Sequence, residues 1–254
     1  MTKKETSDAK TKKAPNLTLP KEDGLWWLGP WSNLVHCKHC HGLTGPRECS
    51  VCGANDPVSS YRTEERNGVV LEISQGAVSH TMHSLLLLMK RECERPTQGE
   101  IAQVLPNSAS EHAMIVILFW TLFEHIFEQL LRTGAGSLPP RVTKDLFNRH
   151  QSIGARMNGL YSILFGATME ADLKESGHNK TYDFLRRVQK KRNDFIHGDA
   201  EAIDDALVAE TLKRLRDVQA AWLAIYNKRC TGNPNAPPVW QNHHAQATSR
   251  TSGK

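Results

Sequence analysis

The sequence has 254 residues, of which 39% are hydrophobic, so the chain can bury a sizeable core and is not disordered throughout. It carries 32 basic and 27 acidic residues, and the net charge of +5 is compatible with an anionic partner but too small to identify one. The longest apolar run, residues 114–123, is far shorter than the roughly 20 residues of a membrane span, and no apolar segment of a secretory signal follows the basic opening. We therefore expect a cytoplasmic protein with no membrane partner.

Both ends of the chain are poor in apolar residues. Residues 1–22 are rich in Lys, Thr and Pro and predict a disordered basic arm. Residues 232–254 predict a disordered tail, in which His243 and His244 could bind a metal but are more simply solvated.

A cysteine cluster follows the arm, in a segment that we place at residues 23–58. Four of the six cysteines form two Cys-x2-Cys pairs separated by eight residues: Cys37, Cys40, Cys49 and Cys52. Four thiolates at this spacing suit one tetrahedral Zn²⁺, and a site filled by four protein ligands is structural rather than catalytic. The pattern therefore predicts a small zinc ribbon.

Other interpretations of this segment remain open. The cysteines could form two redox dithiols, or disulfides in an oxidising compartment, although a reducing cytoplasm favours a metal. One of three neighbouring histidines could replace a thiolate: His36, His39 and His41. Three tryptophans are expected to pack against the ribbon, with stacking on a nucleobase as the alternative: Trp26, Trp27 and Trp31.

Residues 59–107 predict a connection that contains a strand at 68–74 and a helix at 77–94. From 108 to 231 the apolar periodicity is strongly helical, with helices expected at 110–134, 138–150, 156–165, 182–197 and 202–229 and a loop at 177–180. The helix at 110–134 has a wide apolar face and is expected at the centre: Met114, Ile117, Leu118, Thr121, Leu122, Phe123, Ile126 and Leu130. The predicted fold is therefore mainly α, a bundle of four or five helices preceded by the ribbon.

The stretch RNDFIH, residues 192–197, ends the fourth of these helices. Asn193 and His197 are four residues apart and share a face, whereas Arg192 lies about 140° from His197 on a regular helix. These residues serve one site only if the helix is distorted, if the Arg side chain reaches round, or if a second copy brings its own motif alongside. The alternative is a solvated Arg192 and a His197 that caps the helix before Gly198.

Together, a histidine and an arginine supply what RNA cleavage requires. An imidazole takes and returns a proton near neutral pH, and a guanidinium stabilises the charge on a phosphate. The pair suffices for metal-independent attack of an RNA 2′-hydroxyl on the adjacent 3′-phosphate, which gives a 2′,3′-cyclic phosphate and a 5′-hydroxyl end.

The motif, the last long helix after it and the apolar helix carrying FEHIFEQLL before it resemble the HEPN domain family over about residues 108–230. Ribonucleases of that family carry Arg, often followed by a polar residue, and His four to six residues beyond. The resemblance implies a bundle that dimerises and brings two motifs into one cleft. It assigns Arg192 and His197 to the motif and Asn193 to the polar position, and Glu124 or Glu128 would match an acidic residue that some members use.

The resulting prediction is a metal-independent endoribonuclease with a structural zinc and no catalytic metal. In this interpretation His197 is the general acid and base, Arg192 stabilises the phosphorane and Asn193 positions one of them. Since many family members are toxins or effectors of bacterial defence, the expected partners are RNA, a second copy of the chain and an antitoxin or defence-system protein. The alternative is a non-catalytic binding or assembly protein whose ribbon recognises a protein or nucleic acid. A DNA regulator is less favoured, because the ribbon has few basic residues and no evident recognition helix.

Overall fold

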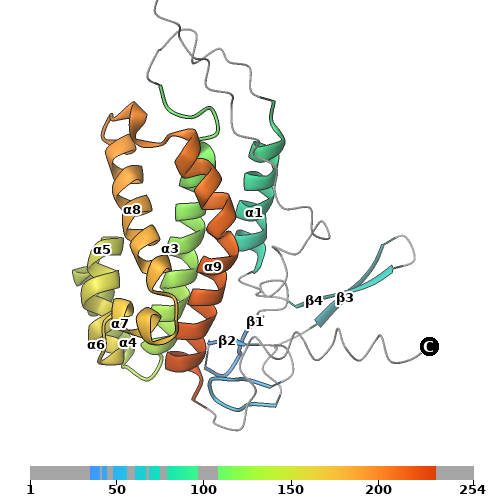
Figure 1. The fold of residues 1–254 in the computed structure, drawn as a ribbon. Helices are drawn as coiled ribbons and strands as arrows, with labels where there is room; N and C mark the ends of the chain where they lie inside the picture. Colours follow the sequence, from blue (N-terminus) through green and yellow to red (C-terminus); the bar gives the residue numbers. More distant parts are fainter. Residues whose placement is uncertain are drawn as a thin grey trace, which may run out of the picture.

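The computed structural model describes residues 35–40, 42–44, 48–55, 61–66, 69–74, 79–96 and 108–232, and it is mainly helical (Figure 1). This confirms the predicted fold class. The predicted basic arm, the three tryptophans and the tail beyond residue 232 lie outside the described residues. In the part that is described, the strands form two antiparallel hairpins, β1 (Val35–His36) with β2 (Leu43–Thr44) and β3 (Tyr61–Arg66) with β4 (Val69–Ser74).

The helical part follows the predicted order, with one helix added and one longer than expected. Its elements are α1 (Ser79–Glu94), α3 (Met114–Gly134), α4 (Pro140–Arg149), α5 (Ile153–Ala155), the π-helical turn η2 (Arg156–Leu160), α6 (Tyr161–Phe165), α7 (Met169–Glu175), α8 (Asn179–Ile196), the 3-10 turn η3 (Ala200–Ala202) and α9 (Asp205–Cys230). α7 was not predicted, and α8 begins three residues earlier than expected. The predicted loop at 177–180 is therefore shorter, and Gly177 within it has a φ of +79°.

α3 is the central helix and packs against α1, α8 and α9. Ten of its side chains are buried: Ile115, Val116, Phe119, Trp120, Leu122, Phe123, Ile126, Phe127, Leu130 and Leu131. The predicted face was partly wrong, because Met114 is 52% exposed and Thr121 is also exposed. Apolar residues surround this helix on nearly every side, so periodicity alone did not determine which side faces the solvent.

α3 is also long and apolar enough to cross a membrane by length and composition, and it is the one such helix in the described part of the chain. Its most apolar window is 56% buried within the bundle. The core helix of a soluble bundle passes the same test, so this helix is weak evidence for a membrane span.

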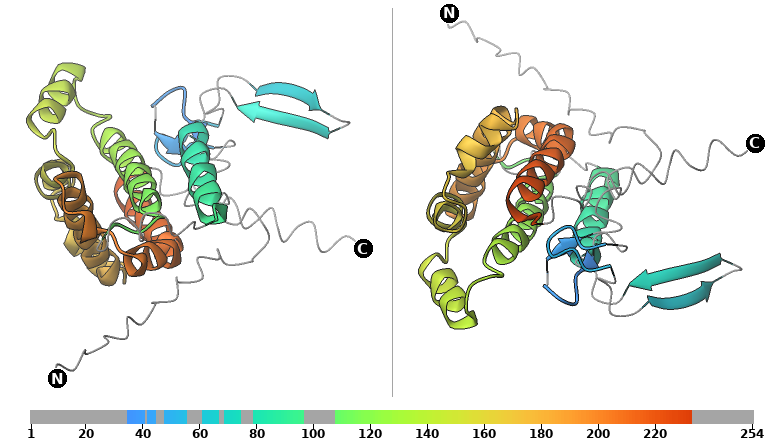
Figure 2. Two further views of the ribbon diagram at one scale, coloured as in Figure 1. Left: turned by 90° about the horizontal axis from the view of Figure 1, so that it is seen from above. Right: turned by 90° about the horizontal axis from the view of Figure 1, so that it is seen from below.

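α1 belongs to the same core as the bundle. Met82, Leu85, Leu86 and Met89 are buried in one cluster with the residues of α3 and α9. Figure 2 shows α1 beside α3, on the side away from α8. The helix expected within the connecting segment 59–107 is thus a packed member of the bundle, and the predicted strand in that segment is confirmed as β4.

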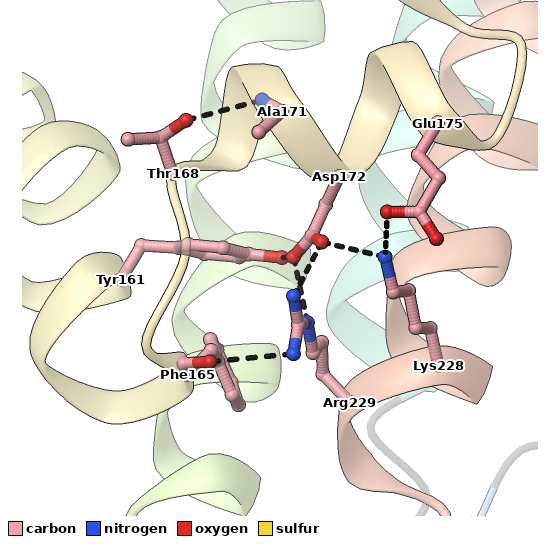
Figure 3. A network of polar contacts seen from close by, with 8 residues as sticks. All are labelled: Tyr161, Phe165, Thr168, Ala171, Asp172, Glu175, Lys228 and Arg229. Atoms are coloured by element: carbon pink, nitrogen blue, oxygen red, sulfur yellow. Dashed lines mark hydrogen bonds and ion pairs between the residues drawn. The ribbon is translucent and has the colours of Figure 1, made fainter.

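A buried ionic network joins α6, α7 and α9 (Figure 3). The Asp172 carboxylate, 1% exposed, accepts hydrogen bonds from Tyr161 Oη (2.5 Å), from Lys228 Nζ (2.8 Å) and from Arg229 Nε and Nη2 (2.7 and 2.5 Å). Lys228 also pairs with Glu175 at 2.8 Å. Burial alone would raise the pKa of Asp172, but the hydrogen bonds from Arg229, Lys228 and Tyr161 outweigh it and lower that pKa to about 2. The network is a closed set of paired charges, which fixes three helices against one another.

Candidate functional site

The four predicted cysteines lie together. All four Sγ atoms lie within 4.8 Å of one another, with Cys37 and Cys52 at 3.8 Å and Cys40 and Cys49 at 3.6 Å. A tetrahedral ion with metal–sulfur bonds of about 2.3 Å places its sulfur ligands about 3.8 Å apart. The cluster therefore fits one metal ion, and the sulfur distances are too long for disulfide bonds, which are about 2 Å.

The two Cys-x2-Cys turns are held by backbone hydrogen bonds. The Cys37 N–H donates to the Gly42 carbonyl (2.9 Å), and the Cys49 N–H donates to the Ala54 carbonyl (2.8 Å). Gly53 adopts a φ of +76°, which a side chain would disfavour, and this lets the second turn close. Of the three neighbouring histidines, His39 is exposed and does not join the ligand cluster, while the side chains of the other two lie outside the described residues.

Backbone amides also point at the sulfur atoms. The His39 N–H donates to Cys37 Sγ and the Cys52 N–H donates to Cys49 Sγ, both at 3.4 Å. Burial raises the pKa of Cys40 and of Cys49, so ionising these thiols has a cost that a bound cation offsets. Backbone N–H donors and a bound cation both stabilise the thiolate form of a cysteine, so this arrangement suits turns that hold a metal ion.

The cysteine turns pack against one end of the bundle. A methyl group on buried Gly42 would lie 2.7 Å from Val51 Cγ2 and 3.3 Å from Thr133 Cγ2, on the last turn of α3. A methyl group on Gly232, just beyond α9, would lie 2.7 Å from the Val51 carbonyl oxygen. The cysteine turns therefore meet the C-terminal ends of both α3 and α9, and glycine permits the close approach.

The RNDFIH stretch forms the C-terminal end of α8. The helix is regular to Ile196, and His197 is its C-cap residue. Gly198, with a φ of +105°, donates to the Phe195 carbonyl (3.1 Å), and Asp199 donates to the Asp194 carbonyl (3.0 Å). This pair of hydrogen bonds is a Schellman motif, so the alternative interpretation of His197 and Gly198 as a helix end is confirmed. His197 itself is exposed.

Arg192 leans from the core side of α8 toward Asn193. Its Nη1 donates to Asn193 Oδ1 at 3.1 Å, while its Nε is buried and has no hydrogen-bond partner. Within the described residues, Arg192 forms no ion pair with a carboxylate and no hydrogen bond with His197. Of the three arrangements considered from the sequence, helix distortion is absent from this end of α8, and the long Arg side chain reaches toward the face that Asn193 shares with His197.

Neither glutamate of the upstream helix joins the motif. Glu124 accepts a hydrogen bond from Trp120 Nε1 at 2.6 Å. Glu128 pairs with Arg132 at 2.5 Å and with Arg156 at 3.2 Å. The hydrogen-bond and ion-pair partners of both carboxylates, Trp120, Arg132 and Arg156, thus lie on α3 and on η2 and do not include Arg192 or His197.

No protein-family model matches the chain, and neither does any curated protein or solved structure. The resemblance to the HEPN family accordingly rests on the helical pattern of residues 108–230 and on the RNDFIH stretch.

The cysteine turns and the RNDFIH stretch lie at opposite ends of α3. The Ser110 N–H, just before α3, donates to the carbonyl of Ile203 (2.8 Å), six residues beyond His197. Thr133, at the other end of α3, contacts the cysteine turns. α3 has 21 residues and is therefore about 30 Å long, so nearly the whole length of this helix lies between the two sites. Figure 1 shows the end of α8 and the strands of the cysteine segment near opposite ends of α3.

Proposed function

We propose that this protein is a metal-independent endoribonuclease whose catalytic groups are His197 and Arg192, with Asn193 as the positioning residue. The observation that carries the proposal is the arrangement at the end of α8. An exposed imidazole lies on the same face as an amide that holds a guanidinium, and that guanidinium has no carboxylate partner among the described residues.

The proposed reaction is an internal phosphoryl transfer. His197, as the neutral imidazole, removes the proton of a ribose 2′-hydroxyl, and that oxygen forms a bond to the adjacent phosphorus. The bond from phosphorus to the 5′-oxygen breaks, and the leaving oxygen takes a proton from an imidazolium. Arg192 stabilises the extra negative charge on the phosphorane, since its charge is not neutralised by an acid.

A second copy of the chain would complete the site. One imidazole cannot act as base and acid in the same concerted step, so the second proton requires another group. A two-fold axis close to the end of α8 would place the partner's motif there. Ile196, next to His197, is 52% exposed and offers an apolar contact for such a pairing.

The four-cysteine cluster has a structural part in this proposal. We assign it to Zn²⁺, because four thiolates and a tetrahedral sulfur spacing suit that ion. The ion would hold the two cysteine turns in shape against α3 and α9, and it supplies no chemistry at His197. A toxin or defence role with a dedicated partner protein belongs to the same proposal and rests on the family resemblance alone.

The decisive experiment is RNA cleavage by the purified full chain in the presence of EDTA. We expect 2′,3′-cyclic phosphate and 5′-hydroxyl ends, and a loss of at least about 100-fold in rate for His197→Ala and for Arg192→Ala. His178→Ala, at the other end of the same helix, and Arg141→Ala, on exposed α4, are matched controls that should cleave normally. Wild-type cleavage by both motif variants would refute the assignment, and RNA binding without cleavage would favour the non-catalytic assembly protein.

A further inference from the structure

One side of α8 is polar along its whole length and leads to His197. At about 100° per residue, six side chains fall within a sector of roughly 100°, which we call the α8 track: Tyr182, Arg186, Gln189, Lys190, Asn193 and His197. The opposite side is buried, with Phe184, Leu185 and Val188 in the core. The side chains of the track are exposed or half-buried.

Two arginines, Arg186 on the track and Arg192 beside it, are held by amides instead of acids. Arg186 Nη1 donates to Gln189 Oε1 at 2.9 Å, as Arg192 Nη1 donates to Asn193 Oδ1 at 3.1 Å. Neither guanidinium forms an ion pair with any residue that the structure describes. An amide oxygen orients a guanidinium without cancelling its charge, so both remain able to attract an anion.

Several other cations nearby have acidic partners. Arg187 pairs with Glu210 at 2.5 Å, and Arg214 pairs with the same carboxylate at 2.8 Å. Lys190, although on the track, pairs with Asp194 at 2.6 Å. Of the lysines and arginines on the track, Arg186 is therefore the one without an acidic partner in the described part of the chain, and Arg192, beside the track and next to Asn193, also has none.

We propose that the α8 track holds the phosphate backbone of single-stranded RNA on one side of the cleaved bond, with Arg186 binding a phosphate. This inference rests on the proposed function, since it places the strand whose cleavage is assigned to His197. From Arg186 to His197 the helix rises about 16 Å, which a few nucleotides can follow. A planar guanidinium with free N–H groups matches a phosphate, and no carboxylate must first be displaced.

A single strand fits this track better than a duplex does. The track is one face of one helix and offers a single line of charge. In addition, attack by the 2′-hydroxyl requires the 2′-oxygen in line with the bond that breaks, and a regular A-form duplex holds it off that line. A flexible strand reaches the in-line geometry without first being unpaired.

The test measures binding separately from cleavage. The probe is a labelled single-stranded RNA with 2′-O-methyl groups throughout, which cannot attack its own phosphates, and the readout is fluorescence anisotropy over a range of salt concentrations. Arg186→Gln is expected to weaken binding about tenfold and to reduce the slope of log affinity against log salt by about one. Arg141→Gln removes an equal charge on α4 and is expected to change affinity less than about twofold.

A variant that binds the probe more tightly serves as a further control, because misfolding would weaken binding and would not strengthen it. Asp194→Asn removes the carboxylate that neutralises Lys190, so it should tighten binding several-fold. Equal affinity of Arg186→Gln and wild type would overturn the inference, and so would equal losses for Arg186→Gln and Arg141→Gln. An equal dependence on Arg186 in a 2′-O-methyl duplex would overturn the assignment to single strands.

The two proposals fail separately. If unmodified RNA is never cleaved but Arg186→Gln weakens probe binding, the α8 track stands as an RNA-binding surface and the ribonuclease does not. If RNA is cleaved at His197 but Arg186→Gln binds the probe normally, the ribonuclease stands and the α8 track is overturned.

Discussion

Replacing Asp172 with Asn should destabilise the protein by about 3 kcal/mol at pH 7. Removing one partner of a buried ion pair costs about 3–5 kcal/mol, and an Asn that still accepts one hydrogen bond falls at the low end. Part of this energy depends on pH, because the pKa of Asp172 falls from an ordinary value of 3.8 to about 2 in the folded protein. At about 1.4 kcal/mol for each tenfold change in proton affinity, that shift corresponds to about 2 kcal/mol.

The sign of the pH dependence follows from the direction of the shift. Since the folded protein holds this proton less tightly than the unfolded chain, the stabilisation is complete above about pH 4 and is lost as the pH falls toward 2. The difference in unfolding free energy between wild type and Asp172→Asn should therefore shrink by about 2 kcal/mol over that window.

Urea unfolding followed by circular dichroism at several pH values measures this difference. Glu175→Gln is the matched control, because Glu175 is 73% exposed and shares only Lys228 with the network. It should cost less than about 1 kcal/mol. A loss below about 1 kcal/mol for Asp172→Asn, or a difference that stays constant from pH 7 to pH 2, would refute the reasoning.

Two further predictions concern the ends of the bundle. Metal analysis should find one tightly bound ion per chain, lost in Cys49→Ser and kept in Cys93→Ser; release of the ion should increase hydrogen exchange around Thr133, and unchanged exchange would show that the cysteine turns do not brace α3. Gly198→Ala should lower the free energy of unfolding by about 1–2 kcal/mol, because a φ of +105° disfavours a Cβ, and Gly198→Asn should lower it less; thermal unfolding checks both, and equal losses would argue against backbone strain.

The features that the sequence predicted well are those encoded over short distances. Two Cys-x2-Cys pairs eight residues apart match the ligand spacing of a four-cysteine metal site, and their Sγ atoms do lie within 4.8 Å of one another. Apolar periodicity predicts helices of three turns or more, and it predicted α8 and α9. By contrast, β3 has the sequence YRTEER, in which apolar and polar residues do not alternate. The sequence therefore did not predict this strand or its pairing with β4.

The features that the sequence missed depend on tertiary contacts. Asp172 and Arg229 are 57 residues apart, and nothing local distinguishes this buried aspartate from the many exposed ones. Likewise, the helical wheel places Arg192 away from His197, and the hydrogen bond from its Nη1 to Asn193 Oδ1 depends on the side-chain rotamer, which the wheel does not predict. Periodicity predicts the side of a helix on which a residue lies, but it does not predict where the tip of a long side chain lies.

An ion at the four cysteines would be too far from His197 to take part in the proposed reaction, so its role would be structural. An ion held by Cys37, Cys40, Cys49 and Cys52 lies beside the C-terminal ends of α3 and α9, whereas His197 lies near the beginning of α3, about 30 Å away. A charge at that distance is screened by solvent and salt, since the Debye length is about 8 Å at physiological ionic strength. Metal loss can therefore reach the end of α8 only through the packing of α3 and α9. A chelator should therefore have no immediate effect on cleavage and should inhibit it only as fast as the packing of the bundle loosens. Inhibition that is faster than the change in hydrogen exchange at Thr133 would indicate a metal ion at the reaction site.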